Sequence, residues 1–550
     1  MIWSGLKEKR VSTFNREYDV LVLGSGCAAM VAALHAARAG LSVLICEKTS
    51  LYGGTSAMSA GGIWIAANHL AHDEGIEDSV DEAISYIKAA LPENGNRSAQ
   101  WRAMLEAGPS MLRLLEQYTP LRFRLTEEPD PYIDLPGAKL SGRMMSVLPI
   151  SRFAAKRNAL RIRGSTLPEI FTYHEVLETD LYHRPISTVL RLLPRLAGRA
   201  LRLGAGKGTA LMIGLVRGCM DAGCKLENKA RAVELIIENE RVCGAVVEKN
   251  GRKHNVRARV GTLIATGGFE WNEAMMEEHF GSPRQFVGPP AGNTGDGQKL
   301  AAAAGAALGA MDQATITAAI PRRYHGRIHG MPVPYHAEEN AIVVNMAGQR
   351  FEDELHVNLG EALNRRDPET GSFPNQPAFV ITDANYLRKA PLVRFFSRLS
   401  PGWMRKGATL EDLAAKTGID ARALAVTVAR YNQFAETGID EDFGRGKTRR
   451  HQKADKRKRA GIEPIARSPF IAIRFDRSFM STKGGAETDH RGRVLRPNGS
   501  TIEGLYAAGS AMANPIGTRG VGAGTTLGPF MSWGYVCAQD IIDRAREQSD

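Results

Sequence analysis

The stretch YDVLVLGSGCAAMVAALHAARAGLSVLICEK, residues 18–48, contains the pattern that decides the fold. The apolar run 19–23 predicts a short buried strand, and residues 30–39 predict a helix that ends at Gly40. Residues 42–46 predict a second strand, parallel to the first. A strand, a tight glycine-rich turn, a helix and a second strand in this order predict the first unit of a Rossmann-like α/β domain.

The turn between the first strand and the helix has the residues that a dinucleotide requires. Gly24 permits the bend, and Gly26 lets the backbone approach a pyrophosphate, which the N-terminus of the helix then faces with free N–H groups. Glu47 ends the second strand, where its carboxylate can accept both hydroxyls of an adenosine ribose. The alternative interpretation is a structural turn that binds no dinucleotide, but such a turn would not require these elements in this order. The predicted contacts are Gly24, Gly26, Cys27, Ala28, Glu47 and Lys48.

Two clusters of small residues follow at once and favour a flavin over a nicotinamide. They lie in LYGGTSAMSAGGIWIAAN, residues 51–68. The pyrophosphate and ring of a flavin dinucleotide extend along a second backbone segment, where side chains must be small, whereas a nicotinamide cofactor needs no such segment. An ordinary loop is the alternative interpretation. The predicted contacts are Gly53, Gly54, Thr55, Ser56, Ser59, Gly61 and Gly62.

A β-meander is predicted further along the chain, over residues 226–269. It is expected to return to the parallel sheet at 261–265, and backbone groups near Ala232 are well placed to meet the adenine. Thr266 and Gly267 follow the returning strand and are predicted cofactor contacts.

The composition excludes several classes of protein. The chain has 550 residues, a net charge of +12 and six cysteines, which is enough length for two or three domains. The cysteines are too few for a disulfide framework and lack the paired spacing of a zinc site, so we expect no metal and a reducing, cytoplasmic location. No basic stripe interleaved with aromatic residues indicates nucleic-acid binding. The first 17 residues lack the apolar core of a secretion signal, and no run of 18 apolar residues predicts a membrane-spanning helix.

Two basic segments have alternative interpretations. Residues 186–217 are basic and apolar with almost no acid. They predict a helix and loop packed on the protein body or, alternatively, a peripheral contact with an anionic bilayer or an access route for an apolar substrate. The basic run 445–461 predicts a solvated loop.

Four later segments resemble the flavoprotein family of fumarate reductase, succinate dehydrogenase and the 3-ketosteroid dehydrogenases, and the resemblance covers nearly the whole chain. They are GNTGDGQKLAAAAGAAL (292–308), AIVVNMAGQRFEDE (341–354), SPFIAIRFDRSFMSTKGGAETDHRGRVL (468–495) and GLYAAGSAMANPIGTRGVGAGTTLGP (504–529). Within the family, MSTKGG (480–485) and GAGTTLGP (522–529) resemble the 3-ketosteroid dehydrogenase branch. The soluble fumarate reductases have a histidine beside the threonine of the first of these motifs.

The resemblance implies that the cofactor is FAD. Thr55 and Ser56 stand where the complex-type members attach the flavin to a histidine, so non-covalent FAD is implied. A helix expected near Thr525 would point its N-terminus at the flavin N1–O2 edge, where negative charge develops on reduction. The further FAD contacts implied are Asp296, Gly509, Gly524, Thr526 and Leu527.

The branch also implies a reaction. Its members desaturate a cyclic ketone such as a 3-ketosteroid α,β to the carbonyl. A base removes the α proton, donors stabilise the enolate oxygen, and flavin N5 accepts a hydride from the β carbon. The partners implied are a small hydrophobic ketone and an electron acceptor that the sequence does not identify.

The substrate-side residues depart from the branch. Tyr132, within DPYIDLPGAKLSGRMM (130–145), resembles its first active-site tyrosine, and the Gly524 N–H would hold the ketone oxygen. Asn358 and Gly520 stand where the branch has two further tyrosines, its base and its second oxyanion donor.

Other side chains are candidates for the missing roles. His356 can act as a base near neutral pH, and Tyr335, Tyr324 and His336 are nearby alternatives. Arg519 can stabilise an enolate or bind a substrate carboxylate.

The fold expected is therefore α/β, with a Rossmann-like FAD-binding domain of parallel sheet plus β-meander and an inserted α+β substrate domain. We expect the FAD-binding domain to comprise residues 1–310 and 469–550, and the inserted domain residues 311–468. A fumarate- or enoate-type reductase acting on an unsaturated carboxylate is the alternative function, and a catalytically silent FAD-binding protein is a third.

Overall fold

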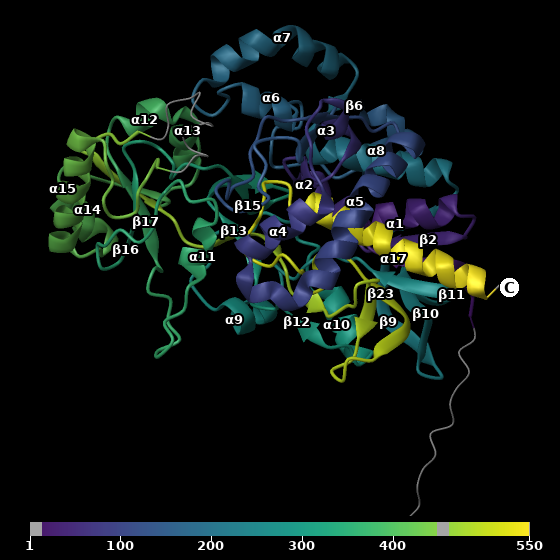
Figure 1. Cartoon of the computed structure of the whole chain (residues 1–550). Helices are drawn as coiled ribbons and strands as arrows, with labels where there is room; N and C mark the ends of the chain where they lie inside the picture. Colours follow the sequence, from purple (N-terminus) through teal and green to yellow (C-terminus); the bar gives the residue numbers. More distant parts are fainter. Residues whose placement is uncertain (1–13, 448–460, 549–550) are drawn as a thin grey trace, which may run out of the picture.

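A mixed sheet forms the centre of the first domain (Figure 1). The structure, a computed structural model, describes residues 14–447 and 461–548. The strand order is β22-β23-β11-β1-β2-β8, and β9 and β10 extend β11 as an antiparallel meander. Strands β23, β11, β1, β2 and β8 run parallel. The strands are β1 (Arg16–Leu23), β2 (Val43–Glu47), β8 (Lys225–Asn228), β9 (Ala230–Glu238), β10 (Arg241–Lys249), β11 (Arg252–Ile264), β22 (Arg493–Leu495) and β23 (Thr501–Ala507).

The predicted strand–turn–helix–strand unit and the predicted meander are both present. Residues 20–23 of β1 pair with 43–46 of β2 and with 261–264 of β11, and all of 20–23 are buried. Helices α1 and α17 contact these strands. A strand that is buried on both faces is expected to be an uninterrupted apolar run, as residues 20–23 are. Helix α1 (Cys27–Arg38) begins three residues before the predicted start.

The C-terminal helix, α17 (Leu527–Glu547), packs directly against α1. A Cβ on Gly534 would lie 2.2 Å from the Ala28 carbonyl oxygen, so only glycine permits this approach.

The other elements of this domain are α2 (Gly54–Met58), β3 (Gly62–Trp64), α3 (His69–Asp73), α4 (Val80–Ala90), η1 (Pro92–Arg97), α5 (Ser98–Tyr118), β4 (Phe123–Leu125), β5 (Met144–Val147), β6 (Ile150–Ser151), η2 (Arg152–Arg161), α6 (Tyr173–Glu178), α7 (Pro185–Leu201), β7 (Gly204–Ala205), α8 (Lys207–Asp221), α9 (Glu273–Phe280), α10 (Asp296–Ala303), β12 (Leu308–Gly309), β21 (Gly485–Ala486) and η3 (Gly509–Ala511).

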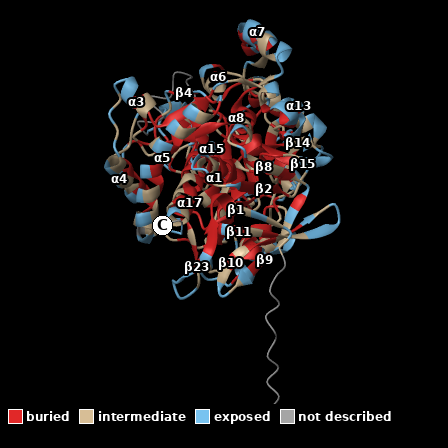
Figure 2. Cartoon of the chain, turned by 90° about the vertical axis from the view of Figure 1, so that its right-hand side faces the viewer, coloured by how far each residue is buried: buried red, intermediate tan, exposed pale blue. Residues whose placement is uncertain are grey.

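A second domain is built on the sheet β16-β17-β19-β18, which α14 and α15 cover. Its elements are β13 (Ala314–Thr317), β14 (Ala319–Tyr324), β15 (Arg327–Pro332), β16 (Ile342–Asn345), α11 (Leu359–Asn364), β17 (Ala378–Thr382), α12 (Tyr386–Lys389), α13 (Pro391–Leu399), β18 (Met404–Gly407), α14 (Leu410–Thr417), α15 (Ala421–Thr437), β19 (Phe470–Arg474) and β20 (Ser478–Thr482). Figure 2 shows the buried residues gathered inside both domains. The predicted fold class, a Rossmann-like α/β domain with an inserted α+β domain, is confirmed.

The second domain boundary is best drawn after β20. Strand β19 pairs with β17 and β18, and Phe475 and Phe479 belong to the core of the inserted domain. We therefore propose a boundary near residue 483, after the end of β20 at Thr482, in place of 468. Apolar alternation predicts a strand but not the sheet that it joins, which explains the difference.

The start of the basic run 445–461, which was predicted to be a solvated loop, is buried in a network of ion pairs. Arg445, the first residue of the run 445–461, is buried and donates to Glu354 Oε2 at 2.8 Å. Glu354 also accepts two hydrogen bonds from Arg350. Residues 448–460 lie outside the described residues. In the part of the chain that the structure describes, no helix is long and apolar enough to cross a membrane.

Candidate cofactor and substrate site

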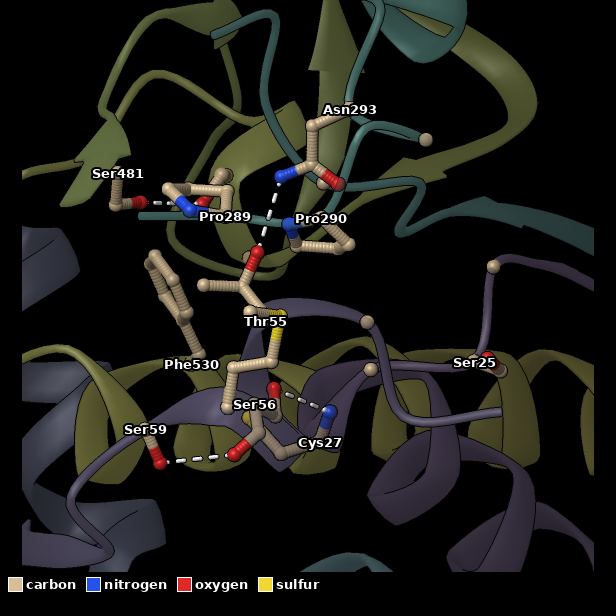
Figure 3. Close-up of a pocket in the computed structure, with 18 of the residues that line it drawn as sticks. Ser25, Cys27, Thr55, Ser56, Ser59, Pro289, Pro290, Asn293, Ser481 and Phe530 are labelled. Carbon is tan, nitrogen blue, oxygen red and sulfur yellow. Dashed lines mark hydrogen bonds between the residues drawn. The ribbon is translucent and has the colours of Figure 1, made fainter. Parts of the chain in front are cut away.

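A cavity of about 380 Å³ runs past the carboxyl ends of β1, β2 and β11. Its wall consists largely of glycine, alanine, serine and threonine from segments far apart in the chain (Figure 3). The lining includes most of the predicted cofactor contacts, namely Gly24, Gly26, Cys27, Ala28, Glu47, Lys48, Gly54, Thr55, Ser56, Ser59, Gly61, Gly62, Ala232, Thr266, Gly267, Asp296, Gly509, Thr526 and Leu527.

The N-terminus of α1 faces this cavity. Its N-cap residue is Gly26, which has no side chain with which to cap the helix. The Cys27 N–H donates to Ser56 Oγ at 3.0 Å, which ties the turn to α2. An uncapped helix N-terminus at the end of a cavity is suited to bind an anion such as a pyrophosphate.

Glu47 is held where the sequence predicted a ribose-binding acid. It is 8% exposed, and its carboxylate accepts from Ser25 Oγ at 2.5 Å and from the Thr49 N–H at 2.8 Å. These contacts leave acceptor capacity for hydroxyl groups, because a carboxylate has about four lone-pair sites.

The basic side chains of the lining gather near Glu47 and the Asp296 carboxylate. Lys48 Nζ and Arg231 Nε each lie 3.0 Å from Asp296 Oδ2. Burial acts to raise the pKa of Asp296, but Lys48 and Arg231 hold it below its usual value. Arg163 Nη2 donates to Thr49 Oγ1 at 3.1 Å, and its buried Nε has no hydrogen-bond partner among the residues that the structure describes.

The cavity fits FAD on these observations. A dinucleotide requires bare backbone at its pyrophosphate, an acid at its ribose and donors along its length, and all three are present. Thr266 Oγ1 is buried at the wall and has no hydrogen-bond partner within residues 14–447 and 461–548, so it can bind a polar atom of a ligand. Thr55 and Ser56 offer no histidine for a covalent link, so the FAD expected here is non-covalent.

Two predicted contacts lie behind the wall instead of on it. Gly53 has a φ of 109°, and a Cβ there would lie 2.8 Å from Ala57 Cβ, so this glycine shapes the turn into α2. A Cβ on Gly524 would lie 2.4 Å from the Trp64 nitrogen, which places Gly524 against β3. Its neighbours Ala523 and Thr526 reach the cavity.

Sequence reasoning missed several residues of the wall. Asn293 Nδ2 donates to Thr55 Oγ1 at 3.0 Å and to Glu270 Oε2 at 2.9 Å, joining the two sides of the cavity (Figure 3). Lys483 does not line the cavity but is buried and donates to the lining residue Thr526 Oγ1 at 3.1 Å, and burial lowers its pKa to about 8. Asn293 and Lys483 both lie in motifs recognised from the sequence, but no local pattern predicted these side-chain contacts. Other missed lining residues are Ser25, Arg163, Thr166, Tyr173, Met480, Ser481, Ser510 and Phe530.

Tyr132, Asn358 and Gly520 form a hydrogen-bonded cluster. Asn358 Nδ2 donates to the Tyr132 hydroxyl at 2.6 Å and to the Gly520 carbonyl at 3.1 Å. Asn358 Oδ1 accepts from the Gly520 N–H at 2.9 Å. The three positions at which the branch has tyrosines are therefore neighbours in space, although none of them is among the residues that line the cavity.

The other proposed catalytic residues have different surroundings. Arg519 Nε donates to both oxygens of Glu361, at 3.1 and 3.0 Å, so its charge is neutralised. The ring of His356 lies 6.5 Å from that of Tyr132, centre to centre. Tyr335 is fully buried in the core of the inserted domain, and its hydroxyl donates to the Arg474 carbonyl at 2.8 Å. Burial also raises its pKa well above the usual value, so this placement does not support a catalytic role.

Two other tyrosine and histidine candidates also have structural partners. The Tyr324 hydroxyl donates to the Gly164 carbonyl at 2.8 Å. His336 is buried beside Phe475, and burial lowers its pKa to about 4.

Comparisons with known proteins agree with this geometry. A family model described as "FAD binding domain" matches residues 19–527. The chain is 33% identical to a 3-oxosteroid 1-dehydrogenase of Mycolicibacterium smegmatis, over 96% of this chain and 98% of that protein. It is 35% identical to a 4-oxocyclohexanecarboxylate 2-dehydrogenase of Sinomonas cyclohexanicum, over 99% of this chain and 96% of the relative. The crystal structure of 3-ketosteroid delta1-dehydrogenase from Sterolibacterium denitrificans, in complex with 1,4-androstadiene-3,17-dione, matches with a TM-score of 0.86 and 31% identity, covering 96% of this chain and 100% of that one.

Proposed function

Because this chain belongs to the FAD binding domain family, we propose that it is an FAD-dependent dehydrogenase that desaturates a cyclic ketone α,β to the carbonyl. The observation that carries this proposal is the cavity itself. Its dinucleotide end presents bare backbone, an acid and cations. The cluster of Tyr132, Asn358 and Gly520 does not itself line the cavity, but Gly520 precedes the lining residue Ala523 by three positions, and we propose that this cluster forms the substrate end of the site. Two relatives at 33% and 35% identity are named as dehydrogenases of cyclic ketones.

The protein's part in this reaction is to orient the ketone and manage its charge. When bound, FAD supplies the oxidant, which accepts a hydride from the β carbon. The Tyr132 hydroxyl is the donor that we assign to the ketone oxygen. Asn358 donates to that hydroxyl, which strengthens it as a donor to an enolate as charge develops.

A neutral ring ketone suits the cavity better than a carboxylate-bearing one. Among the described lining residues, the basic side chains are Lys48, Arg163 and Arg231, and all three bind groups at the dinucleotide end. Met480, Pro332 and Phe530 contribute apolar surface elsewhere in the lining. A 3-ketosteroid or a similar polycycle is therefore the substrate class that we favour over 4-oxocyclohexanecarboxylate.

The reductase alternative has less support. Reduction of an unsaturated carboxylate requires a cation that binds the acid group, and the sequence analysis proposed Arg519 for this role. Arg519 is paired with Glu361 through both carboxylate oxygens. Met480-Ser481-Thr482 also lacks the histidine that the soluble fumarate reductases have.

The direct test uses the purified holoenzyme with an artificial electron acceptor. We expect 3-ketosteroids to bleach the flavin absorbance and to yield the α,β-unsaturated ketone, with simple cyclohexanones slower and 4-oxocyclohexanecarboxylate slowest. Absence of bleaching by every ketone, together with reoxidation of the reduced flavin by an unsaturated acid, would establish the reductase instead. The physiological electron acceptor is the second partner that this reaction requires.

We also propose that α7 makes a peripheral contact with an anionic bilayer. In both views α7 lies at the edge of the molecule, away from the central sheet (Figures 1 and 2). Ile186, Leu190 and Leu193 are 77%, 65% and 52% exposed. The helix has arginines and no acidic residue, so it complements an anionic surface. The last part of the segment predicted to make this contact is excluded, because residues 207–216 are buried in α8.

Vesicle flotation tests this contact. We expect the protein to float with vesicles containing anionic phosphatidylglycerol and not with pure phosphatidylcholine vesicles. Ile186→Asp with Leu190→Asp should abolish flotation without changing the FAD content. A protein that never floats, or whose flotation survives the double substitution, would contradict the proposal. The cytoplasmic location inferred from the cysteines is compatible with either result.

A further inference from the structure

Tyr173 is a cavity residue that the sequence did not single out. It is the first residue of α6, and it lines the cavity. Its hydroxyl donates to Glu128 Oε2 at 2.7 Å. Glu128 comes from the loop between β4 and β5, the same loop that contains Tyr132. A phenol facing a ligand cavity and bonded to a carboxylate behind it is an arrangement that can accept and pass on a proton.

The position of Tyr173 is firmly fixed. Thr172 and Glu175 form a capping box at the start of α6, and Arg199 donates to both oxygens of Glu175, at 2.6 and 2.7 Å. A Cβ on Gly62 would lie 3.0 Å from Tyr173 Cε1 and 3.1 Å from Cζ. The phenol ring therefore packs directly on the small-residue segment that we assign to the flavin.

Tyr132 and Tyr173 have opposite hydrogen-bond partners. The Tyr132 oxygen accepts from the Asn358 amide nitrogen, which can only donate. Arg519 also lies close to Tyr132: burial acts to lower the pKa of Arg519, but Glu361 and, to a smaller extent, Tyr132 raise it. Such surroundings strengthen a hydroxyl as a donor. The Tyr173 hydroxyl instead donates to a carboxylate, which increases the electron density on its oxygen. Two like groups in contrasting surroundings are suited to the two different roles that the reaction needs.

Resting on the proposed function, we propose that Tyr173 and Glu128 are the proton-transfer pair of the dehydrogenation. The α C–H bond of the ketone breaks, and its proton moves to the Tyr173 oxygen as the Tyr173 proton moves to Glu128 Oε2. The electron pair of that C–H bond becomes the new double bond, and the β hydrogen leaves with its electron pair to the FAD. One proton and one hydride are removed, and the ketone is oxidised by two electrons.

This pair takes the role of the catalytic base, which in the branch is a tyrosine at the position where this chain has Asn358. Asn358 cannot accept a proton near neutral pH, and its amide is already committed to Gly520 and Tyr132. Glu128 is only half-buried, so a proton passed to it can leave to solvent. The pair thus connects the interior of the cavity to the surface.

The experiment uses holoenzymes of the wild type, Tyr173→Phe, Glu128→Gln and the double variant. Tyr506→Phe is a matched control, because the Tyr506 hydroxyl also donates to a carboxylate, Asp540, at 2.8 Å but does not line the cavity. One readout is kcat for dehydrogenation. The other is deuterium exchange from D₂O into the ketone α position on enzyme reduced beforehand, which reports proton transfer without net oxidation. FAD content and product binding are measured for each variant.

We expect both rates to fall about 100-fold or more in Tyr173→Phe and Glu128→Gln, with FAD content and product binding retained. The double variant should be no worse than either single variant, since the two residues act as a unit. Tyr506→Phe should keep both rates within about 2-fold of the wild type.

The outcomes separate the two proposals. Turnover and exchange that persist in Tyr173→Phe would overturn the pair while leaving the dehydrogenase function in place. Exchange that depends on Tyr173 in a protein that oxidises no ketone would support the pair and reject the proposed function. A wild type that neither exchanges nor oxidises any ketone would overturn both.

Discussion

The dinucleotide end and the proposed substrate end of the site are built in different ways. The dinucleotide end is made from backbone, with the turn 24–26 and the helix α1 that follows it in the chain. The substrate end depends on side chains from distant segments, since Asn358 bonds to Tyr132, 226 residues away, and to Gly520, 162 residues away. A site built from backbone restricts the residue type only at its tight positions. A site built from side chains depends on the identity of each member. The substitutions at positions 358 and 520 can therefore alter the substrate end without altering the binding of the cofactor.

The largest effect should come from filling the dinucleotide end. Gly26 has a φ of −72°, and a Cβ there would come no closer than 3.5 Å to Ser56 Oγ, so Gly26→Val leaves the protein foldable but occupies the space for the pyrophosphate. We expect FAD affinity to fall at least about 100-fold, which corresponds to about 3 kcal/mol. Absorbance at the flavin band after gel filtration measures the bound FAD.

Gly24→Ala is the contrasting variant. Its φ is 107°, and a Cβ would lie 2.2 Å from the Ala265 carbonyl oxygen, so this change should disrupt folding itself. Far-UV circular dichroism of the two apo proteins distinguishes a lost ligand from a lost fold. Normal FAD binding by Gly26→Val would contradict the assignment of this turn to the pyrophosphate.

The second prediction concerns His336, a titratable group buried in the inserted domain. Burial lowers the pKa of His336 to about 4. The unfolded chain, with a histidine pKa near 6.5, therefore binds this proton first as the pH falls, and stability is lost between about pH 6.5 and pH 4. His336→Leu should lose about 2.5 kcal/mol less stability than the wild type between pH 7 and pH 4.5.

Urea unfolding at the two pH values measures this difference. The carboxylates that protonate over the same range are common to both proteins, so they cancel in the comparison. An identical pH dependence in the two proteins would show that His336 accepts its proton without cost in the folded state.

The same contrast explains what the sequence could predict. The strands 19–23 and 42–46, the turn and the ribose acid are neighbours in the chain, so periodicity and glycine placement were sufficient to predict them. The meander and most of the cofactor contacts were also predicted from such local patterns. The loss of two tyrosines at Asn358 and Gly520 was also visible.

What takes the place of those tyrosines depends on long-range packing, which no local pattern encodes. Tyr335, a candidate from the sequence, lies in a core because β19 joins the sheet of the inserted domain, so that Arg474 meets its hydroxyl. Tyr173 gave no local signal, because its carboxylate partner lies 45 residues away in the chain. Glu361, which neutralises Arg519, lies 158 residues from it.

A smaller effect is expected at the substrate end from Asn358→Ala. The change removes the donor to Tyr132 and both contacts with the Gly520 backbone, so the tyrosine loses its orientation. We expect kcat to fall about 10-fold and FAD affinity to stay unchanged. Asn375→Ala is the control, since the Asn375 Nδ2 donates to the Ala362 carbonyl in the same domain. An equal loss in both variants would indicate a general loosening of the domain instead of a role at the site.

The smallest effect should follow Arg519→Leu. The ion pair with Glu361 is about one third exposed on both sides, so its loss should change the free energy of unfolding by no more than about 1 kcal/mol. Because Glu361 already neutralises the guanidinium, the variant should process neutral and carboxylate-bearing ketones with the same ratio of kcat/KM as the wild type. Both values should fall only about 3-fold, through weaker polarisation of Tyr132.

Glu361→Gln sharpens this last test by removing the neutralising charge. It should lower KM for 4-oxocyclohexanecarboxylate and leave KM for a neutral steroid ketone unchanged, because only then does Arg519 present an unpaired cation to a substrate acid. If Arg519→Leu alone removed turnover of the acid selectively, the arginine would bind the carboxylate in spite of its partner. The substrate end would then be specialised for acids, and the preference for neutral polycycles would be wrong.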